Sequence, residues 1–176
     1  MLVHTRHAEN FNRLISSFSP KSSVRLIQVT EVGPGTAILL SEAISRGEWV
    51  VVMGDRVPVG ESKRICTVPF MGSLANFPQG PFILGALLKC PAYLLFCLPD
   101  GKGYQVHFEQ FADRIVLPRG NRERAVVDYI RRYAARLEAH VRLAPLQWFN
   151  FYSFWRSDAL PEPDAKPAIE AQGEAA

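Results

Sequence analysis

The chain has 176 residues, of which 48% are hydrophobic and 21% are charged, and its formal net charge is +3 at pH 7. This length suits one domain with a sizeable core, and this composition excludes a wholly disordered chain. No apolar run reaches the roughly 18–20 residues of a membrane span, so we expect any membrane association to be peripheral. The first seven residues contain no apolar segment typical of a signal peptide.

The first third of the chain alternates between strand-like and helix-like patterns. Apolar residues recur at helical spacing between 7 and 18, and Gly47 follows a second helical pattern as a C-terminal glycine does. The segment 49–53 is a continuous apolar run, as parallel strands buried on both faces require. The predicted elements are a strand at 2–5, a helix at 7–18, a strand at 24–29, a helix at 33–45 and a strand at 49–53.

The rest of the chain mixes loops, a hairpin and helices. The turn sequence Asp-Gly-Lys-Gly at 100–103 separates two apolar runs and predicts a β-hairpin. The aromatic stretch at 145–155 predicts a short helix that lies either in the core or at a membrane interface. The predicted elements are a loop at 55–78, a helix at 80–88, strands at 92–98 and 104–109, a helix at 121–142 and the short helix at 145–155.

This order predicts an α/β fold. We expect a mainly parallel sheet with an antiparallel edge hairpin and with helices on both faces. The domain extends over residues 1–157. Residues 158–176 are rich in Pro, Glu and Ala and are expected to form a disordered tail.

Asp55 and Arg56 are the first candidates for a functional role. They follow the predicted strand 49–53, and ligands of open α/β sheets bind beyond the carboxyl ends of strands. An Asp–Arg pair in that position can orient a substrate hydroxyl and offer a guanidinium to a phosphate. The alternative is a structural ion pair that holds the following loop. We favour the functional interpretation because of the strand-end position.

A second candidate is the Phe-Pro-Gln-Gly-Pro segment at 77–81. It predicts a rigid turn before a helix whose first turn contains proline. Backbone amides near Gly80 are suited to an anion, and Phe70 and Phe77 are suited to the wall of an acyl-chain pocket. For these two phenylalanines, ordinary core packing is the more frequent role.

Positive charge is concentrated in the C-terminal third. Such a cluster suits phosphate groups on lipid or nucleic acid, and a solvated helix face explains it equally well. The chain contains no nucleic-acid-binding motif, so we expect no nucleic-acid partner. Three cysteines without metal-ligand spacing lead us to expect no metal and no cofactor. The arginines are Arg114, Arg119, Arg122, Arg124, Arg131, Arg132, Arg136, Arg142 and Arg156.

The order of these motifs resembles the lysophospholipid acyltransferase superfamily, in its lipid A late-acyltransferase branch. The resemblance covers residues 1–157 and corresponds to the C-terminal portion of the family's domain. It implies an O-acyltransferase that moves a fatty acyl chain from a thioester on acyl carrier protein to a hydroxyl of a glycolipid such as a lipid A precursor. It also implies a peripheral location at the cytoplasmic face of the bacterial inner membrane. The motifs are His-Thr-Arg-His-Ala-Glu-Asn at 4–10, Gly-Asp-Arg-Val-Pro at 54–58, Val-Pro-Phe-Met-Gly at 68–72, Ala-Asn-Phe-Pro-Gln-Gly-Pro at 75–81, and Ala-Pro-Leu-Gln-Trp-Phe-Asn-Phe-Tyr at 144–152 with Trp155.

Family members use a histidine followed five positions later by a carboxylate. The histidine removes the hydroxyl proton, and the carboxylate orients it. In the family this motif lies on the strand-to-helix turn before the one that opens this chain, so the resemblance implies an N-terminally truncated domain. His4 and Glu9 are the one candidate pair with this spacing, but they match a later turn, and we interpret their spacing as coincidence. Arg6 and His7 are expected either to line the pocket and contact phosphate or thioester oxygen, or to cap a helix at the surface.

Two alternatives to an active acyltransferase remain open. The first is a non-catalytic remnant that binds acyl and phospholipid groups but lacks the base. The second, ranked last, is a basic nucleic-acid-binding module suggested by the arginines and aromatic residues.

Overall fold

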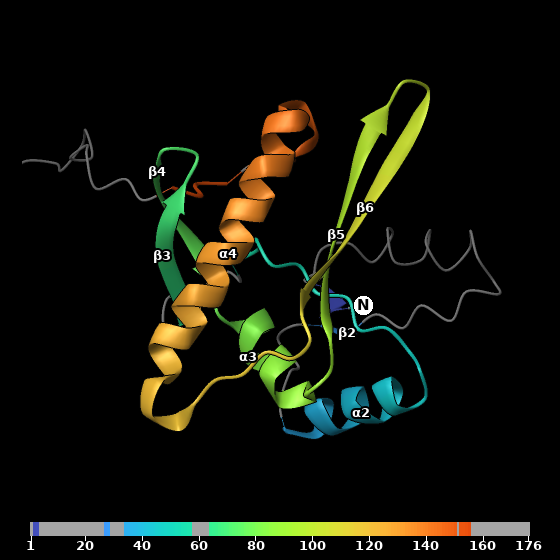
Figure 1. The fold of residues 1–176 in the computed structure, drawn as a ribbon, viewed down its shortest axis with the longest axis vertical. Helices are drawn as coiled ribbons and strands as arrows, with labels where there is room; N and C mark the ends of the chain where they lie inside the picture. Colours follow the sequence, from blue (N-terminus) through green and yellow to red (C-terminus); the bar gives the residue numbers. More distant parts are fainter. Residues whose placement is uncertain (1, 4–26, 29–33, 58–63, 151, 156–176) are drawn as a thin grey trace, which may run out of the picture.

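The computed structural model describes residues 2–3, 27–28, 34–57, 64–150 and 152–155 (Figure 1). Its helices are α2 (Pro34–Ser45), α3 (Gly80–Leu88) and α4 (Arg122–Leu143), with 3-10 turns η3 (Arg119–Asn121) and η4 (Pro145–Gln147). Its strands are β1 (Leu2–Val3), β2 (Ile27–Gln28), β3 (Ile65–Phe70), β4 (Ser73–Pro78), β5 (Ala92–Asp100) and β6 (Gly103–Ala112).

The described strands form separate pairs, and the expected mainly parallel sheet is wrong. The fold is α/β, but its two larger sheets are antiparallel hairpins, β3–β4 and β5–β6. Parallel pairing is limited to the short strands β1 and β2. Helix α4 lies between the two hairpins in Figure 1 and packs against β3 on one side.

The segment 49–53, expected to be a buried strand, is instead an extended connection after α2. Trp49 is 68% exposed and Met53 is 52% exposed. Val50 and Val52 point inward and pack against Leu40 and Leu84. An apolar run alone does not reveal whether a second strand lies beside it, and here only alternate side chains are covered.

The loop expected at 55–78 contains the hairpin β3–β4. Cys66, Val68 and Phe70 alternate inward along β3, as a half-buried strand requires. The hairpin turns through Met71 and Gly72, both at positive φ. Such two-residue turns usually carry Asn-Gly or Asp-Gly, so the sequence gives no turn signal here. The Met71 amide donates to Glu138 Oε2 at 2.8 Å, which ties the turn to α4.

Other expected elements are confirmed with small changes in their bounds. Helices expected at 33–45, 80–88 and 121–142 correspond to α2, α3 and α4, and the expected hairpin corresponds to β5–β6. The helix expected at 145–155 is wrong, because regular helix is limited to η4 and Trp155 forms an antiparallel bridge with Ala75. The expectations for 4–26 and for the tail at 158–176 lie outside the described residues.

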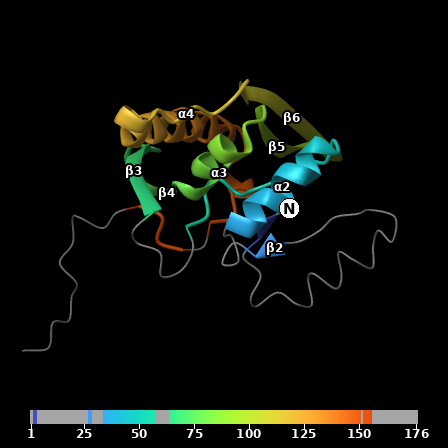
Figure 2. The same cartoon turned by 90° about the horizontal axis from the view of Figure 1, so that it is seen from below.

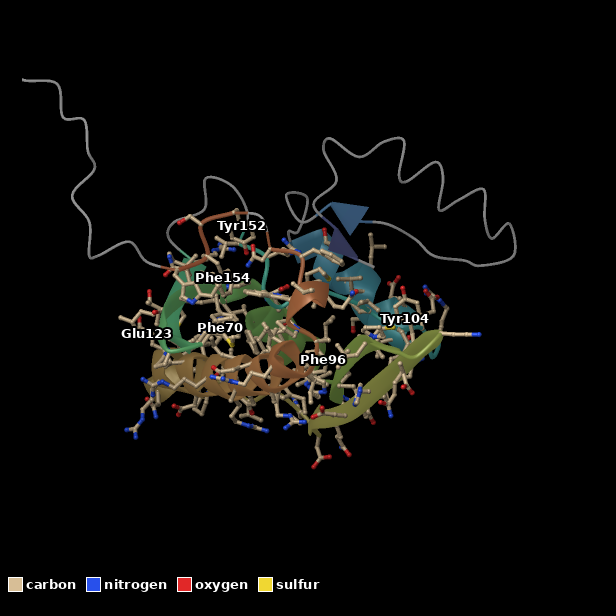
Figure 3. All side chains as sticks on the ribbon, turned by 90° about the horizontal axis from the view of Figure 1, so that it is seen from above. Phe70, Phe96, Tyr104, Glu123, Tyr152 and Phe154 are labelled. Atoms are coloured by element: carbon tan, nitrogen blue, oxygen red, sulfur yellow. The ribbon has the colours of Figure 1, made fainter. Side chains whose placement is uncertain are left out.

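An aromatic core joins the C-terminal segment to the hairpin β3–β4. Phe70 and Phe77 are fully buried, and Phe154 is 1% exposed. The Phe154 ring lies edge-on to both, at centroid distances of 5.5 and 5.0 Å. Figure 3 shows Phe70 and Phe154 directed into the same interior region. Of the two locations expected for the aromatic stretch, Phe154 therefore takes the core.

Candidate functional site

The turn at Gly54–Arg56 is fastened to the C-terminal aromatic segment through Asp55. Asp55 is a buried acid, 7% exposed. Its Oδ2 accepts a hydrogen bond from Trp148 Nε1 at 2.9 Å, and its backbone carbonyl accepts one from the Tyr152 hydroxyl at 2.6 Å. A buried carboxylate needs such donors, so this side chain positions Trp148.

Arg56 faces the same segment. Its guanidinium donates to the carbonyl of Phe149 and lies over the Tyr152 ring, 5.8 Å from the ring centroid. Asp55 and Arg56 form no ion pair with each other in the described part of the chain. The structure therefore brings both residues to one place, where each holds the segment 148–152.

Gly54 makes this close approach feasible. A Cβ atom at position 54 would lie 2.6 Å from Cζ of Tyr133, well inside van der Waals contact. Burial, reinforced by the charge of Asp55, raises the pKa of the Tyr133 phenol. The Tyr133 phenol is therefore uncharged at physiological pH, and its ring packs against the Gly54 turn.

Trp148 also forms one wall of an apolar groove of about 240 Å³ between β5 and the C-terminal half of α4. Met53, just before the Gly54 turn, forms another wall. The hydrogen bond from Trp148 to Asp55 thus fixes the shape of this groove. The remaining lining residues are Leu95, Phe96, Cys97, Leu98, Leu137, His140, Val141, Ala144 and Gln147.

His140 is the single histidine that lines this apolar groove. Its ring stacks on Phe96 at a centroid distance of 3.9 Å (Phe96 is labelled in Figure 3). Its Nδ1 lies 2.8 Å from the carbonyl oxygen of Arg136, and its Nε2 lies 3.3 Å from Glu109 Oε1. A carbonyl only accepts hydrogen bonds, so Nδ1 donates to Arg136. Nε2 lies beside the Glu109 carboxylate, and His140 thus links α4 to β6.

Glu109 is the centre of this polar cluster. Arg136 donates to both of its oxygens, Nε to Oε2 at 2.8 Å and Nη2 to Oε1 at 2.7 Å. The hydrogen bond from Arg136 lowers the pKa of the Glu109 carboxyl, burial partly opposes this, and the nearby charges of Arg136, His140 and His107 reinforce it. The cluster fastens the hairpin β5–β6 to α4.

A second groove, of about 420 Å³, lies between α3, the connection 114–117 and the start of α4. We call it the cationic groove. Arg114 and Arg122 line it, and neither guanidinium has an ion-pair partner among the residues that the structure describes. Figure 1 shows the connection from β6 passing α3 to the start of α4. The apolar lining residues are Ile83, Ala86, Leu87, Ile115, Val116 and Leu117.

Most other arginines of α4 are already engaged. Arg131 pairs with Asp128 at 3.8 Å, Arg142 pairs with Glu138 at 2.6 Å, and Arg132 Nη2 donates to the carbonyl of Phe111 at 2.7 Å. Arg122 and Arg124 are the arginines of α4 that have no ion-pair or hydrogen-bond partner of this kind among the described residues, and Arg122 lines the cationic groove.

The other candidates from the sequence lie away from both grooves. Phe70 and Phe77 are in the aromatic core, and Gly80 is exposed at the start of α3. His4, Arg6, His7 and Glu9 lie outside the described residues. The described residues contain no cluster of His, Cys, Asp or Glu that could hold a metal ion.

Sequence reasoning missed His140 and left Arg114 and Arg122 as undistinguished members of a cluster. A signal for His140 exists, because it falls three residues after Leu137 on the buried face of α4. A polar side chain on the buried, apolar face of a helix needs a hydrogen-bond partner. The helical spacing of Arg131 with Asp128 and of Arg142 with Glu138 is a signal for two of the paired arginines. The partners of Arg132 and Arg136 come from β6, so no sequence signal separates those two from Arg114 and Arg122.

We expect Gly54→Ala to lower the free energy of unfolding by about 1–3 kcal/mol, because the added methyl group overlaps Tyr133. Urea unfolding followed by tryptophan fluorescence measures this change. Gly35→Ala is the matched control, since a Cβ there meets nothing within 4 Å. Equal stability of the two variants contradicts the close packing of the Gly54 turn on Tyr133.

We expect Glu109 to make stability depend on pH in the acidic range. Because the folded-state pKa of Glu109 is below its ordinary value of 4.5, its contribution is present above that value and is lost as pH falls through the folded pKa. The unfolding free energy of Glu109→Gln should therefore fall less steeply with acidification than that of the wild type. Glu42→Gln on the exposed side of α2 is the control, and an identical acid profile for wild type and Glu109→Gln counts against the cluster.

No protein-family model matches the chain, and no curated protein matches its sequence. No helix of the described residues is long and apolar enough to cross a membrane. The geometry of the two grooves is therefore the main basis for assigning a function.

Proposed function

We propose that the chain is an acyltransferase-type domain that binds a fatty acyl thioester and an acidic glycolipid, such as a lipid A precursor, and serves transfer of the acyl chain to a glycolipid hydroxyl. Acyl carrier protein is the proposed acyl donor. The proposed location is the cytoplasmic face of the bacterial inner membrane, as a peripheral protein. This proposal combines the resemblance of the motifs with the chemistry of the two grooves.

The cationic groove is the observation that carries the proposal. An acidic lipid presents an apolar chain next to a negatively charged headgroup. The groove offers apolar side chains from α3 and the 115–117 connection next to Arg114 and Arg122, which have no ion-pair partner among the described residues. Guanidinium groups bind phosphate oxygens in a bidentate manner, so the groove matches both parts of such a ligand.

The apolar groove beside β5 is the proposed site of the second acyl chain. Its walls are mainly hydrophobic, and its ionisable residues are Cys97 and His140, of which His140 contacts Arg136 and Glu109. Binding sites for small molecules are mostly apolar with few polar groups. The Asp55–Trp148 hydrogen bond supports this groove indirectly, because it fixes Trp148.

In the proposed reaction, a glycolipid hydroxyl attacks the thioester carbonyl, its proton passes to a base, and the thiol of the carrier leaves. Among the described residues, His140 lines the apolar groove, but its Nδ1 donates to the Arg136 carbonyl and its Nε2 faces Glu109, so we assign it no role as that base. If the chain supplies no such base, the alternative applies: the chain binds acyl and phosphate groups without transferring them.

The first test is the binding of a single-chain alkyl phosphate, measured by titration calorimetry. We expect Arg114→Gln and Arg122→Gln each to weaken binding about ten-fold, the usual effect of losing one charge-assisted hydrogen bond. Arg124→Gln is the control, since Arg124 is exposed on α4 outside the groove. The alkyl alcohol of the same chain length should bind all variants equally. Equal losses in all three variants would point to general surface charge and reject a defined groove.

The second test is acyl transfer from acyl carrier protein to a membrane lipid extract. Because the spacing of His4 and Glu9 is interpreted as coincidence, we expect His4→Ala to leave the transfer rate equal to that of the wild type. A large loss in this variant would assign His4 as the base. Retained phosphate binding with no transfer by either protein would favour the non-catalytic alternative.

A further inference from the structure

The two faces of the hairpin β5–β6 differ sharply in their surroundings. Side chains alternate between faces, and the strand register assigns each one. One face packs on α4, where Phe96 stacks on His140 and Glu109 pairs with Arg136. We call the opposite one the outer face. Its members are Tyr93, Leu95, Cys97, Pro99, Tyr104, Val106, Phe108 and Gln110.

The outer face is apolar and exposed. Tyr104 is 72% exposed, Leu95 60% and Val106 59%. Trp49 extends the patch, since its ring lies 5.9 Å from that of Tyr93 and 5.7 Å from that of Phe108. Figure 1 shows the hairpin projecting from the body of the protein, and Figure 3 places Tyr104 near its far end. Monomeric proteins rarely expose contiguous apolar patches larger than roughly 300–600 Å².

We propose that the outer face is the interface between two copies of this chain. Covering a patch of aromatic and aliphatic side chains of this extent removes on the order of 800 Å² per copy from water, which is the size of a standard stable interface. The face carries no charged side chain, so two identical copies can meet across a two-fold axis without like-charge repulsion. Elsewhere the chain has a net positive charge.

A bilayer fits the outer face less well than a second copy does. The turn of the hairpin exposes the charged side chains of Asp100 and Lys102. Insertion of the projecting end into a membrane would bring both charges into the bilayer, at a substantial cost. Two hairpins that pack face to face as stacked sheets, about 10 Å apart, leave both charges in water.

The interface would also affect the apolar groove. Leu95 and Cys97 belong both to the outer face and to the lining of that groove. Met53, 52% exposed, lines the same groove. The groove lies on the α4 side of β5, so a second copy seated on the outer face contacts the same strand from the opposite side.

The test is sedimentation equilibrium of the purified chain over a micromolar dilution series. We expect a reversible dimer in the wild type and a shift to monomer, by at least ten-fold in dissociation constant, in Leu95→Lys and Val106→Lys. Leu87→Lys on α3 is the matched control, since Leu87 is also 60% exposed, and it should stay dimeric. Thermal unfolding verifies that the variants fold. A wild-type monomer, or a dimer that both hairpin variants leave intact, overturns the proposal.

Labelling of Cys97 gives a measurement that needs no disruptive variant. Cys97 is exposed within the outer face, so its reaction with a maleimide should slow as protein concentration rises through the dimer dissociation constant. A labelling rate independent of concentration overturns the proposal. Co-sedimentation of a monomeric wild type with phosphatidylglycerol vesicles, lost in Leu95→Lys, would overturn it in favour of a membrane surface.

Discussion

The structure depends most on the attachment of the C-terminal aromatic segment to the Gly54 turn, 93 residues earlier in the chain. The Asp55–Trp148 hydrogen bond and the Tyr152 contact hold this segment in place, and Phe154 then completes the core between Phe70 and Phe77. A buried carboxylate without its donor costs several kcal/mol. Asp55 therefore favours one placement of the segment, whereas apolar packing alone would tolerate several.

Much of the local structure could be predicted, because it depends on neighbours in sequence. The apolar face of α4 has helical spacing, and the β5–β6 turn has glycines and an aspartate where turns need them. Prediction failed where a contact with a residue distant in the sequence determines the local structure. The Met71–Gly72 turn is supported by Glu138 of α4. Within the described residues the segment 49–53 forms no strand beyond a single bridge position at Val52, and its apolar composition does not reveal this. The expected parallel sheet followed from the alternation of strand-like and helix-like patterns, whereas parallel pairing in the described part of the chain is limited to β1 and β2.

The candidate site likewise combines residues that the sequence identifies with contact partners that only the fold reveals. The sequence drew attention to Asp55 and Arg56 by their position after an apolar run, but their partners lie in the segment 148–152. The function expected for them, contact with substrate, is untested, and the contacts in the structure are to the protein itself. Likewise, only the folded arrangement separates the paired Arg136 from the unpaired Arg114 and Arg122.

The two proposals are connected by thermodynamic linkage. The apolar groove and the outer face share Leu95 and Cys97 of β5, so a change in the placement of this strand at one of them affects the other. Whatever factor the second copy adds to the affinity for the ligand, the ligand must add to the affinity between the copies. An acyl chain in the groove and a second copy on the outer face would then favour the same placement of β5. The exposed hairpin is therefore the element through which ligand binding and association would be coupled.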